Sequence, residues 1–290
     1  MMKFVRRLLW ALLAFFSACA APPDTISGTV VDDSGAPLAG AVVRVQTTEI
    51  ETTSGPEGKF ALPGLAPEEA VFVTAWGEGY YINGAANVLP GEDVEIVLQA
   101  HHTSDHPEYA WLPSQYHLGV GEDQGCAECH SSGGAGVPLP VDQWRLDAHA
   151  NTASNPHFLT MYLGTDVSGN QSPQTRYATA RDYGRFPLPP DLEQPYYGPG
   201  YKLDFPTTAG NCAACHTPAA SVNNPYGVDP TAVSGVAAEG IPCDLCHKVW
   251  NVQLNPATGL PYANMPGVLS FDFLRPPEGH QFFAGPYDDV

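Results

Sequence analysis

The five-residue pattern C-x-x-C-H occurs three times in this chain of 290 residues and uses six of its seven cysteines. The three copies span Cys126–His130, Cys212–His216 and Cys243–His247. The chain has ten histidines, so chance gives three such histidine placements a probability of roughly 4 × 10⁻⁵. The cysteine spacing and the histidine that follows it therefore need one common explanation.

This pattern is typical of covalent haem c attachment. Two residues between the sulfurs allow one helical turn to reach both vinyl groups of a porphyrin, and the next histidine binds the iron axially. Structural zinc, a redox dithiol and a disulfide are the alternatives, but none of them needs a histidine at that position every time. We therefore predict three haem c groups. The predicted attachment residues are Cys126, Cys129, Cys212, Cys215, Cys243 and Cys246, and the predicted proximal ligands are His130, His216 and His247.

The sixth iron ligands are expected to be mainly histidines. Seven histidines remain, whereas only Met161 and Met265 lie beyond the N-terminal segment, and a Met/His iron would have a higher potential. The distal candidates are His149, which lies on a helix predicted over 141–153 that also carries Trp144, His157 after Pro156, His280 among aromatic residues, and His117. His101, His102 and His106 are expected to be solvated in a polar linker.

The N-terminus has the pattern of an export signal over residues 1–19. Three basic residues precede an apolar stretch, 8–16, that is too short to cross a bilayer but suits a signal peptide. The stretch ends in Ser17-Ala18-Cys19 and resembles a bacterial lipobox, although Phe16 replaces the more usual leucine. We predict an exported lipoprotein, periplasmic or at the cell surface, that is anchored to a membrane through Cys19. The alternative is ordinary cleavage nearby, with Cys19 unmodified.

The charge of the chain excludes one class of partner. Lys and Arg number 12 against 31 for Asp and Glu, which gives a formal net charge of −19. Nucleic-acid binding is not expected, because phosphate contacts need clustered basic residues. Gly and Pro together number 58, 29 of each, and this content predicts a loop-rich fold.

Residues 25–100 have a β pattern. Short runs such as ISGTVV, AVVRVQTT and AVFVTAWG alternate or are β-branched, and Gly/Pro turns separate them, which predicts an antiparallel sandwich. This segment resembles carboxypeptidase regulatory-like domains, so an all-β Ig/transthyretin-like sandwich is implied. The resemblance rests on Gly28, Gly35, Pro37, Leu38, Gly40, Ala41, Gly58, Phe60 and Leu62.

After a linker, 101–118, a second domain is predicted over 119–290. It has few apolar runs, so haem is expected to fill much of its interior, and we predict a loop-rich, mainly α domain. The segments DQWRLDAHA, NPHF, GNCAACHTP and GIPCDLCHKV resemble multihaem cytochromes c, in particular tetrahaem electron carriers of ammonia-oxidising bacteria and their octahaem relatives. The resemblance implies electron transfer between closely packed haems, with other cytochromes or redox proteins as partners. Sequence separation favours the second and third haems as the close pair, since 31 residues separate Cys215 from Cys246 and 86 separate Cys129 from Cys215.

The sequence differs from multihaem cytochromes c in two ways that affect the expected function. The chain has three motifs where relatives carry four or more, and it stops at FFAGPYDDV, so a truncated chain is one hypothesis. An electron carrier is the leading expectation. The alternatives are an oxidoreductase acting on a small nitrogen or sulfur oxyanion at an open haem, and an adhesion or scaffold protein led by the sandwich. Residues that would serve the oxidoreductase are Arg176, Arg181, Arg185, Tyr177 and Tyr183, but no C-x-x-C-K motif is present.

Overall fold

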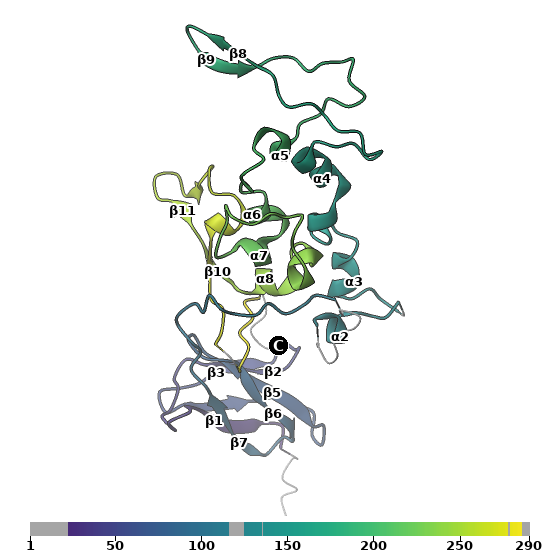
Figure 1. Ribbon diagram of the computed structural model, residues 1–290. Helices are drawn as coiled ribbons and strands as arrows, with labels where there is room; N and C mark the ends of the chain where they lie inside the picture. The colour runs from purple at the N-terminus through teal and green to yellow at the C-terminus, as the bar shows by residue number, and fades with distance from the viewer. Residues whose placement is uncertain (1–22, 116–124, 135, 278, 286–290) are drawn as a thin grey trace, which may run out of the picture. The chain divides into compact units, whose positions relative to one another are not determined.

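The structure is a computed structural model that describes residues 23–115, 125–134, 136–277 and 279–285. The chain divides into two compact units, and the boundary between them falls at His101–His102 (Figure 1). The predicted signal segment, Cys19 and His117 lie outside the described residues. In the described part of the chain, no helix is both long enough and apolar enough to span a bilayer.

The first unit is a β-sandwich of two sheets. One sheet has the order β4 (Lys59–Leu62), β1 (Ile26–Asp32), β7 (Asp93–Leu98), and the other has the order β3 (Glu51–Thr53), β2 (Val42–Val45), β5 (Val71–Trp76), β6 (Asn83–Val88). Side chains alternate between buried and exposed along β1, β2 and β4, as half-buried strands require. The core residues with no exposed surface are Ile26, Val30, Val43, Leu62, Val73 and Leu98.

The predicted sandwich is confirmed, with one correction to its strand directions. β1 pairs with β7 in parallel, from Ser27 opposite Asp93 to Asp32 opposite Leu98, whereas the other strand pairs of the sandwich are antiparallel. Gly28 lies at this pairing. A Cβ at Gly28 would come within 2.2 Å of the Val94 carbonyl oxygen, so the residue has to be glycine.

The second unit consists of short elements joined by loops. Its α-helices are α2 (Ala127–His130), α3 (Pro140–Trp144), α4 (Pro156–Leu163), α5 (Tyr201–Asp204), α6 (Ala213–His216), α7 (Pro218–Ser221) and α8 (Cys243–His247). Its 3₁₀ turns are η1 (Thr152–Ser154), η2 (Gly235–Glu239) and η3 (Gly267–Ser270). Its two-stranded sheets are β8 (Tyr177–Ala180) with β9 (Gly184–Pro187), β10 (Val249–Val252) with β13 (Phe271–Phe273), and β11 (Leu254–Asn255) with β12 (Leu260–Pro261).

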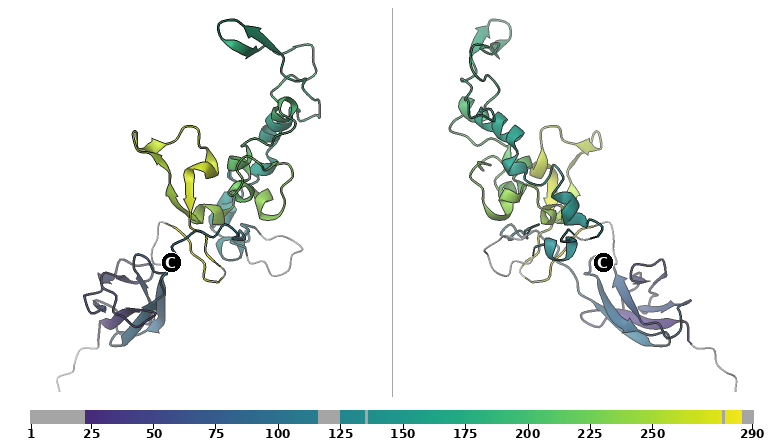
Figure 2. Two further views of the ribbon diagram at one scale, coloured as in Figure 1. Left: turned by 60° about the vertical axis from the view of Figure 1, so that its left-hand side comes forward. Right: turned by 90° about the vertical axis from the view of Figure 1, so that its right-hand side faces the viewer.

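The second unit is loop-rich, but the mainly α character expected for it is wrong. The longest described helix in this unit, α4, has eight residues, and most of the others have four or five. The buried apolar residues of this unit are mostly small, with alanine the commonest. Figure 2 shows β8 and β9 as a hairpin that extends away from the helices of this unit.

The helix predicted over 141–153 is correct only as far as Trp144. α3 ends there, and turns follow before α4 begins. Asn155, two residues after the end of the predicted helix, starts α4. Its side chain accepts hydrogen bonds from the amides of His157 and Phe158, and Pro156 occupies the first helical position. Asn is a favoured N-cap and Pro a favoured first residue, which explains this start.

The segment predicted as a linker is hydrogen-bonded to the rest of the second unit. Asp105 accepts hydrogen bonds from the backbone amide of Arg275 and its Nε at 2.8 Å. Further along, the amide of Ser114 donates to Glu239 Oε2 at 2.7 Å. His102 and His106 are half-buried there, and their rings lie 6.0 Å apart. Residues 102–115 therefore belong to the second unit by their contacts.

Candidate functional site

Each C-x-x-C-H motif forms one helical turn. The His130 amide donates to the carbonyl of Cys126 at 2.9 Å, and the His216 amide donates to the carbonyl of Cys212 at 3.0 Å. In the third motif α8 spans all five residues, Cys243–His247. A single turn of this kind brings both sulfurs and the imidazole to one side of the backbone, as attachment to one planar group requires.

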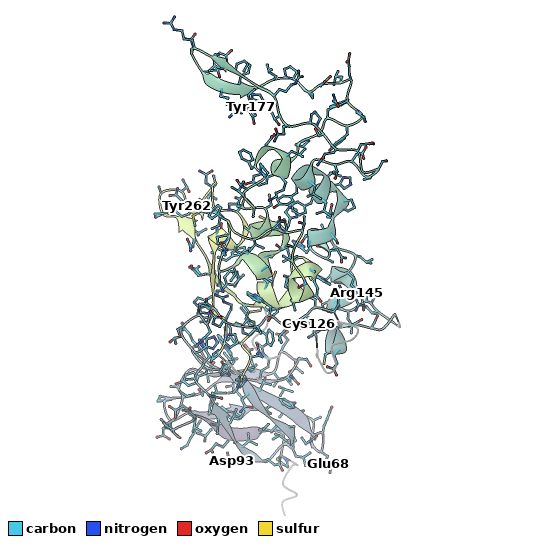
Figure 3. All side chains as sticks on the ribbon, in the orientation of Figure 1. Glu68, Asp93, Cys126, Arg145, Tyr177 and Tyr262 are labelled. Atoms are coloured by element: carbon cyan, nitrogen blue, oxygen red, sulfur yellow. The ribbon has the colours of Figure 1, made fainter. Side chains whose placement is uncertain are left out.

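The three motifs share one pattern of burial. In each, the first cysteine is half-buried, the second is exposed, and at least one of the two residues between them is buried. The buried intervening residues are Ala127, Ala213, Ala214, Asp244 and Leu245. Each turn is thus fixed to the protein by its intervening residues, and its second cysteine faces open space. Cys126 begins the first of these turns and is labelled in Figure 3.

A cavity of about 330 Å³ lies beside the second motif. Cys212, Cys215 and His216 all line it, and the rings of Tyr162 and Tyr201 form part of its wall. These two rings stack, with their centroids 5.8 Å apart. The two thiols and the imidazole therefore face one apolar, aromatic space, which fits a porphyrin attached at these residues.

Phe158 contacts the His216 imidazole, and Thr152 contacts the backbone of the same residue. The ring of Phe158 stacks on it with the centroids 3.7 Å apart and the planes 9° apart. Thr152 Oγ1 donates to the His216 carbonyl oxygen at 2.7 Å. The Nδ1 atom of His216 is buried without a hydrogen bond, so stacking fixes the plane of the ring. Burial also lowers the pKa of His216, which favours the neutral imidazole that binds metals.

The His247 imidazole is oriented by a backbone carbonyl. Its Nδ1 lies 2.8 Å from the carbonyl oxygen of Ala284. A carbonyl oxygen can only accept a hydrogen bond, so Nδ1 is the donor and Nε2 is the nitrogen that could face a metal. Metal-binding histidines are commonly held in this way. The arrangement suits His247 as an axial iron ligand through Nε2.

A buried ion pair lies directly against the third motif. Asp244 and Lys248 have fully buried side chains, and their carboxylate and ammonium groups are 2.7 Å apart. Lys248 Nζ also lies 3.9 Å from the centroid of the Phe283 ring. Burial lowers the pKa of Lys248, although Asp244 opposes this shift. The pair joins the second residue of α8 to the residue at its C-cap.

The first and third motifs meet at their first cysteines. A hydrogen bond between the free thiols raises the pKa of Cys126 and lowers that of Cys243 to about 6. The amide of Cys243 donates to Ser114 Oγ at 2.8 Å, which holds the third motif against the segment before the first. Sequence separation favours the second and third motifs as neighbours, but the sulfur contact joins the first and third.

His149 lies beside the third motif rather than on a helix. Its carbonyl accepts a hydrogen bond from the amide of Ile241 at 3.1 Å. The carbonyl of Ile241 in turn accepts a hydrogen bond from Trp144 Nε1 at 2.9 Å. The His149 ring is exposed, and its Nδ1 hydrogen-bonds the carboxylate of Asp147. A carboxylate at Nδ1 leaves Nε2 available to a metal, so the local geometry is compatible with a distal role.

The other described distal candidates lie apart from the cavity at the second motif. His157 is exposed on α4, and His280 is exposed in the final described segment. Neither lines the cavity, nor does His149. Phe158, which directly follows His157, is the residue of the NPHF segment that meets a motif histidine.

The basic and phenolic residues of the oxidoreductase alternative lie on or beside the β8–β9 hairpin. Tyr177, labelled in Figure 3, is the first residue of β8. The Arg185 guanidinium lies 4.0 Å from the centroid of the Tyr177 ring. Tyr183 is 73% exposed. None of Arg176, Arg181, Arg185, Tyr177 and Tyr183 lines the cavity at the second motif.

The zinc alternative gains no support from the described residues. No group of three or more His, Cys, Asp or Glu side chains in that part of the chain is arranged to hold a metal ion. A structural zinc site needs four such ligands together. The six motif cysteines are also free of disulfides.

Comparison with known proteins identifies the first unit only. Residues 25–100 match the family model of the carboxypeptidase regulatory-like domain. No curated protein matches the chain.

Three solved structures that match this chain each cover less than a third of it. A cohesin–X-dockerin complex from Acetivibrio cellulolyticus is 22% identical over 27% of this chain and 58% of its own, with a TM-score of 0.24. A hydroxyquinol 1,2-dioxygenase from Pseudomonas putida DLL-E4 is 13% identical over 29% of this chain and 58% of its own, with a TM-score of 0.23. A dioxygenase domain from a carbohydrate-binding fusion protein of Streptomyces sp. SirexAA-E is 19% identical over 29% of this chain and 84% of its own, with a TM-score of 0.19.

At these TM-scores the likenesses carry no argument about fold or function. The family match is independent of them and coincides with the β-sandwich seen in the structure. Residues 25–100 are a carboxypeptidase regulatory-like domain.

Proposed function

We propose that this chain is an exported multihaem cytochrome c that carries electrons through three covalently attached haems. The observation that carries the proposal is the repeated C-x-x-C-H motif, which in all three copies forms a helical turn with an exposed second cysteine. The cavity lined by Cys212, Cys215 and His216 supports it, because one space adjoins every group that haem attachment needs.

The haem supplies one-electron redox chemistry, and the protein holds and orients it. Cys126, Cys129, Cys212, Cys215, Cys243 and Cys246 would form the thioethers, and His130, His216 and His247 would bind the irons. The contact of His247 Nδ1 with the carbonyl oxygen of Ala284 would leave Nε2 as the nitrogen for the iron. The stacked ring of Phe158 fixes the plane of the His216 imidazole.

The remaining parts of the proposal concern the surroundings of the protein. A lipid on Cys19 would anchor it to a membrane, and other cytochromes or redox proteins would exchange electrons with it. The net charge of −19 favours partners with a basic docking surface, because opposite charge steers the encounter. The carboxypeptidase regulatory-like domain would attach the carrier to a partner or a surface.

The decisive experiment counts haems. The full chain is produced with a haem c maturation system, and intact mass and the pyridine haemochrome spectrum give the number of attached haems. Three variants then replace both cysteines of one motif by serine. We expect three haems in the parent and two in each variant, because a porphyrin without thioethers is lost on denaturation.

The Cys19→Ser variant is the matched control. It also removes a cysteine, the one proposed to carry the lipid, but it should keep three haems and lose only the lipid. A purified chain with no Soret absorption, or with the same haem content in the parent and the motif variants, would refute the proposal.

A further inference from the structure

Few of the described side chains that line the cavity at the second motif are of a type that binds haem iron. Apart from Cys212, Cys215 and His216, its lining includes Met161, Tyr162 and Tyr201. No other histidine of the described residues lines it. Among the described residues, the bis-histidine ligation expected from composition therefore has no second histidine at this cavity.

The two tyrosines are engaged elsewhere. Tyr162 is only 1% exposed, and its hydroxyl donates a hydrogen bond to the carbonyl of Ala209 at 3.2 Å. The Tyr201 hydroxyl hydrogen-bonds Thr208 Oγ1 at 2.7 Å. Their rings form the wall, but their oxygen atoms point to other partners. The other described lining residues, Phe158, Asn211 and Pro266, carry no group that usually binds haem iron, so Met161 is the candidate ligand among the described lining residues.

Met161 occupies a suitable position on α4. It follows Phe158 by three residues, which is about 4.5 Å along a helix axis, and Phe158 stacks on the His216 ring. Phe158, Met161 and Tyr162 form one stripe at i, i+3 and i+4 along the cavity. His157 is on the same helix but is not part of this lining.

The exposure of Met161 also distinguishes it from its neighbours. It is 53% exposed, whereas Phe158 and Tyr162 are 5% and 1% exposed. A thioether on a flexible, unbranched side chain that borders the cavity without being packed is free to turn toward an occupant. Thioether sulfur is an established axial ligand of haem c iron.

We propose that Met161 is the sixth ligand of the iron bound by His216, so that the second haem has Met/His rather than bis-histidine ligation. This inference rests on the proposed function. Methionine ligation raises the reduction potential, so the second haem would be the highest-potential site if the other two are bis-histidine. Electrons entering the chain would collect there.

The test uses the full holoprotein and three variants. Met161→Ala removes the thioether, Met161→His replaces it with imidazole, and Met265→Ala is the matched control. Met265 is half-buried and adjoins Pro266, which lines the cavity, but Met265 itself does not. The readouts are the far-red sulfur-to-iron charge-transfer band of ferric haem, near-infrared magnetic circular dichroism and a redox titration.

We expect the charge-transfer band in the parent and in Met265→Ala, and its loss in both Met161 variants. Met161→His should stay low-spin while the potential of one haem falls. Met161→Ala should gain one high-spin haem that binds carbon monoxide. The histidine variant keeps the test valid if the alanine variant folds poorly.

Three results would overturn the assignment. These are a parent with only bis-histidine spectra, a parent with a high-spin haem that binds carbon monoxide, and loss of the band in Met265→Ala instead. In each of them three haems are still attached, so the proposed function stands. A parent without haem would refute the function itself.

Discussion

Asp244 shows at the scale of one residue how the third motif is fixed in place. It accepts hydrogen bonds from the Tyr109 hydroxyl at 2.8 Å, the Leu112 amide at 2.9 Å and Lys248 Nζ at 2.7 Å. A buried ion pair contributes little net stability, but removing one partner leaves an uncompensated buried charge. The second residue of the motif thus has a structural role apart from attachment.

Replacing Asp244 by leucine is expected to lower the free energy of unfolding of the second unit by about 3–5 kcal/mol, because Lys248 stays buried without its partner. Denaturant unfolding of the holoprotein measures this. The double variant Asp244→Leu/Lys248→Met should recover most of the loss. Arg145→Gln, which breaks the partly exposed 3.7 Å pair with Asp142, should cost less than about 1 kcal/mol. Equal loss in the single and double variants would show that the unpaired charge is not the cause.

At the scale of elements, the segment before the first motif is held by an ion pair beyond the end of β13. Arg275 is 4% exposed, and its guanidinium binds the Asp105 carboxylate at 2.5 Å. Burial opposes ionisation of Asp105, but the hydrogen bonds from Arg275 outweigh it and lower the pKa of that carboxyl. A lowered pKa in the folded state means that the unfolded chain binds more protons as pH falls.

The contribution of Asp105 to stability should therefore be complete above about pH 4, the ordinary range of an aspartate, and should be lost as pH falls through its folded pKa. The measurement is the melting temperature of the parent and of Asp105→Asn across this range. We expect the difference between them to be largest near neutral pH and to shrink on acidification. A difference that stays constant with pH would contradict the role of the charge.

The elements that the sequence predicts well are those with a local pattern. Alternation identifies β1, β2 and β4, whereas β3 and β6 have polar or small residues, and no such pattern marks them. Strand alternation is the same for either direction of pairing, so the parallel pairing of β1 with β7 was not predictable. α3 ends at Trp144, earlier than predicted, and Asn155 with Pro156 begins the separate helix α4, because Asn is a favoured N-cap and Pro a favoured first residue.

Some residues of the candidate site can likewise be predicted from a local sequence pattern, and others cannot. Residue type and spacing identify the six motif cysteines and their histidines without any tertiary information. Phe158 and the carbonyl of Ala284 carry no such signal, because a stacking ring and a backbone acceptor are defined only by the fold. The hydrogen bond from the Ser114 amide to the Glu239 carboxylate is not predictable from the sequence either, because the two residues lie 125 positions apart.

At the scale of the whole molecule, the two units differ in what holds them together. The first has a continuous hydrophobic core between its sheets, including Val30, Val43, Val73 and Leu98. The second buries mostly small side chains, such as Ala127, Ala213 and Ala214, around its motifs. Burial of large apolar side chains supplies most folding free energy, so the second unit should depend on the surface of its proposed haems.

A chain in which all six motif cysteines are replaced by serine should therefore show a single cooperative unfolding transition, with the β-type circular dichroism of the first unit. The isolated segment 23–101 should unfold at the same temperature. The isolated segment serves as the control, because it contains the core but no motif. A second cooperative transition in the haem-free chain would mean that residues 102–285 fold without the cofactor.

The parallel pairing of β1 with β7 also fixes where the chain joins and leaves the sandwich. Ser27 pairs with Asp93 and Asp32 with Leu98, so the chain arrives at one end of the sheet and departs from the opposite end. Six strand residues at about 3.3 Å each set these points roughly 20 Å apart. The domain therefore separates the residues that enter β1 from those that leave β7 by about the length of one strand.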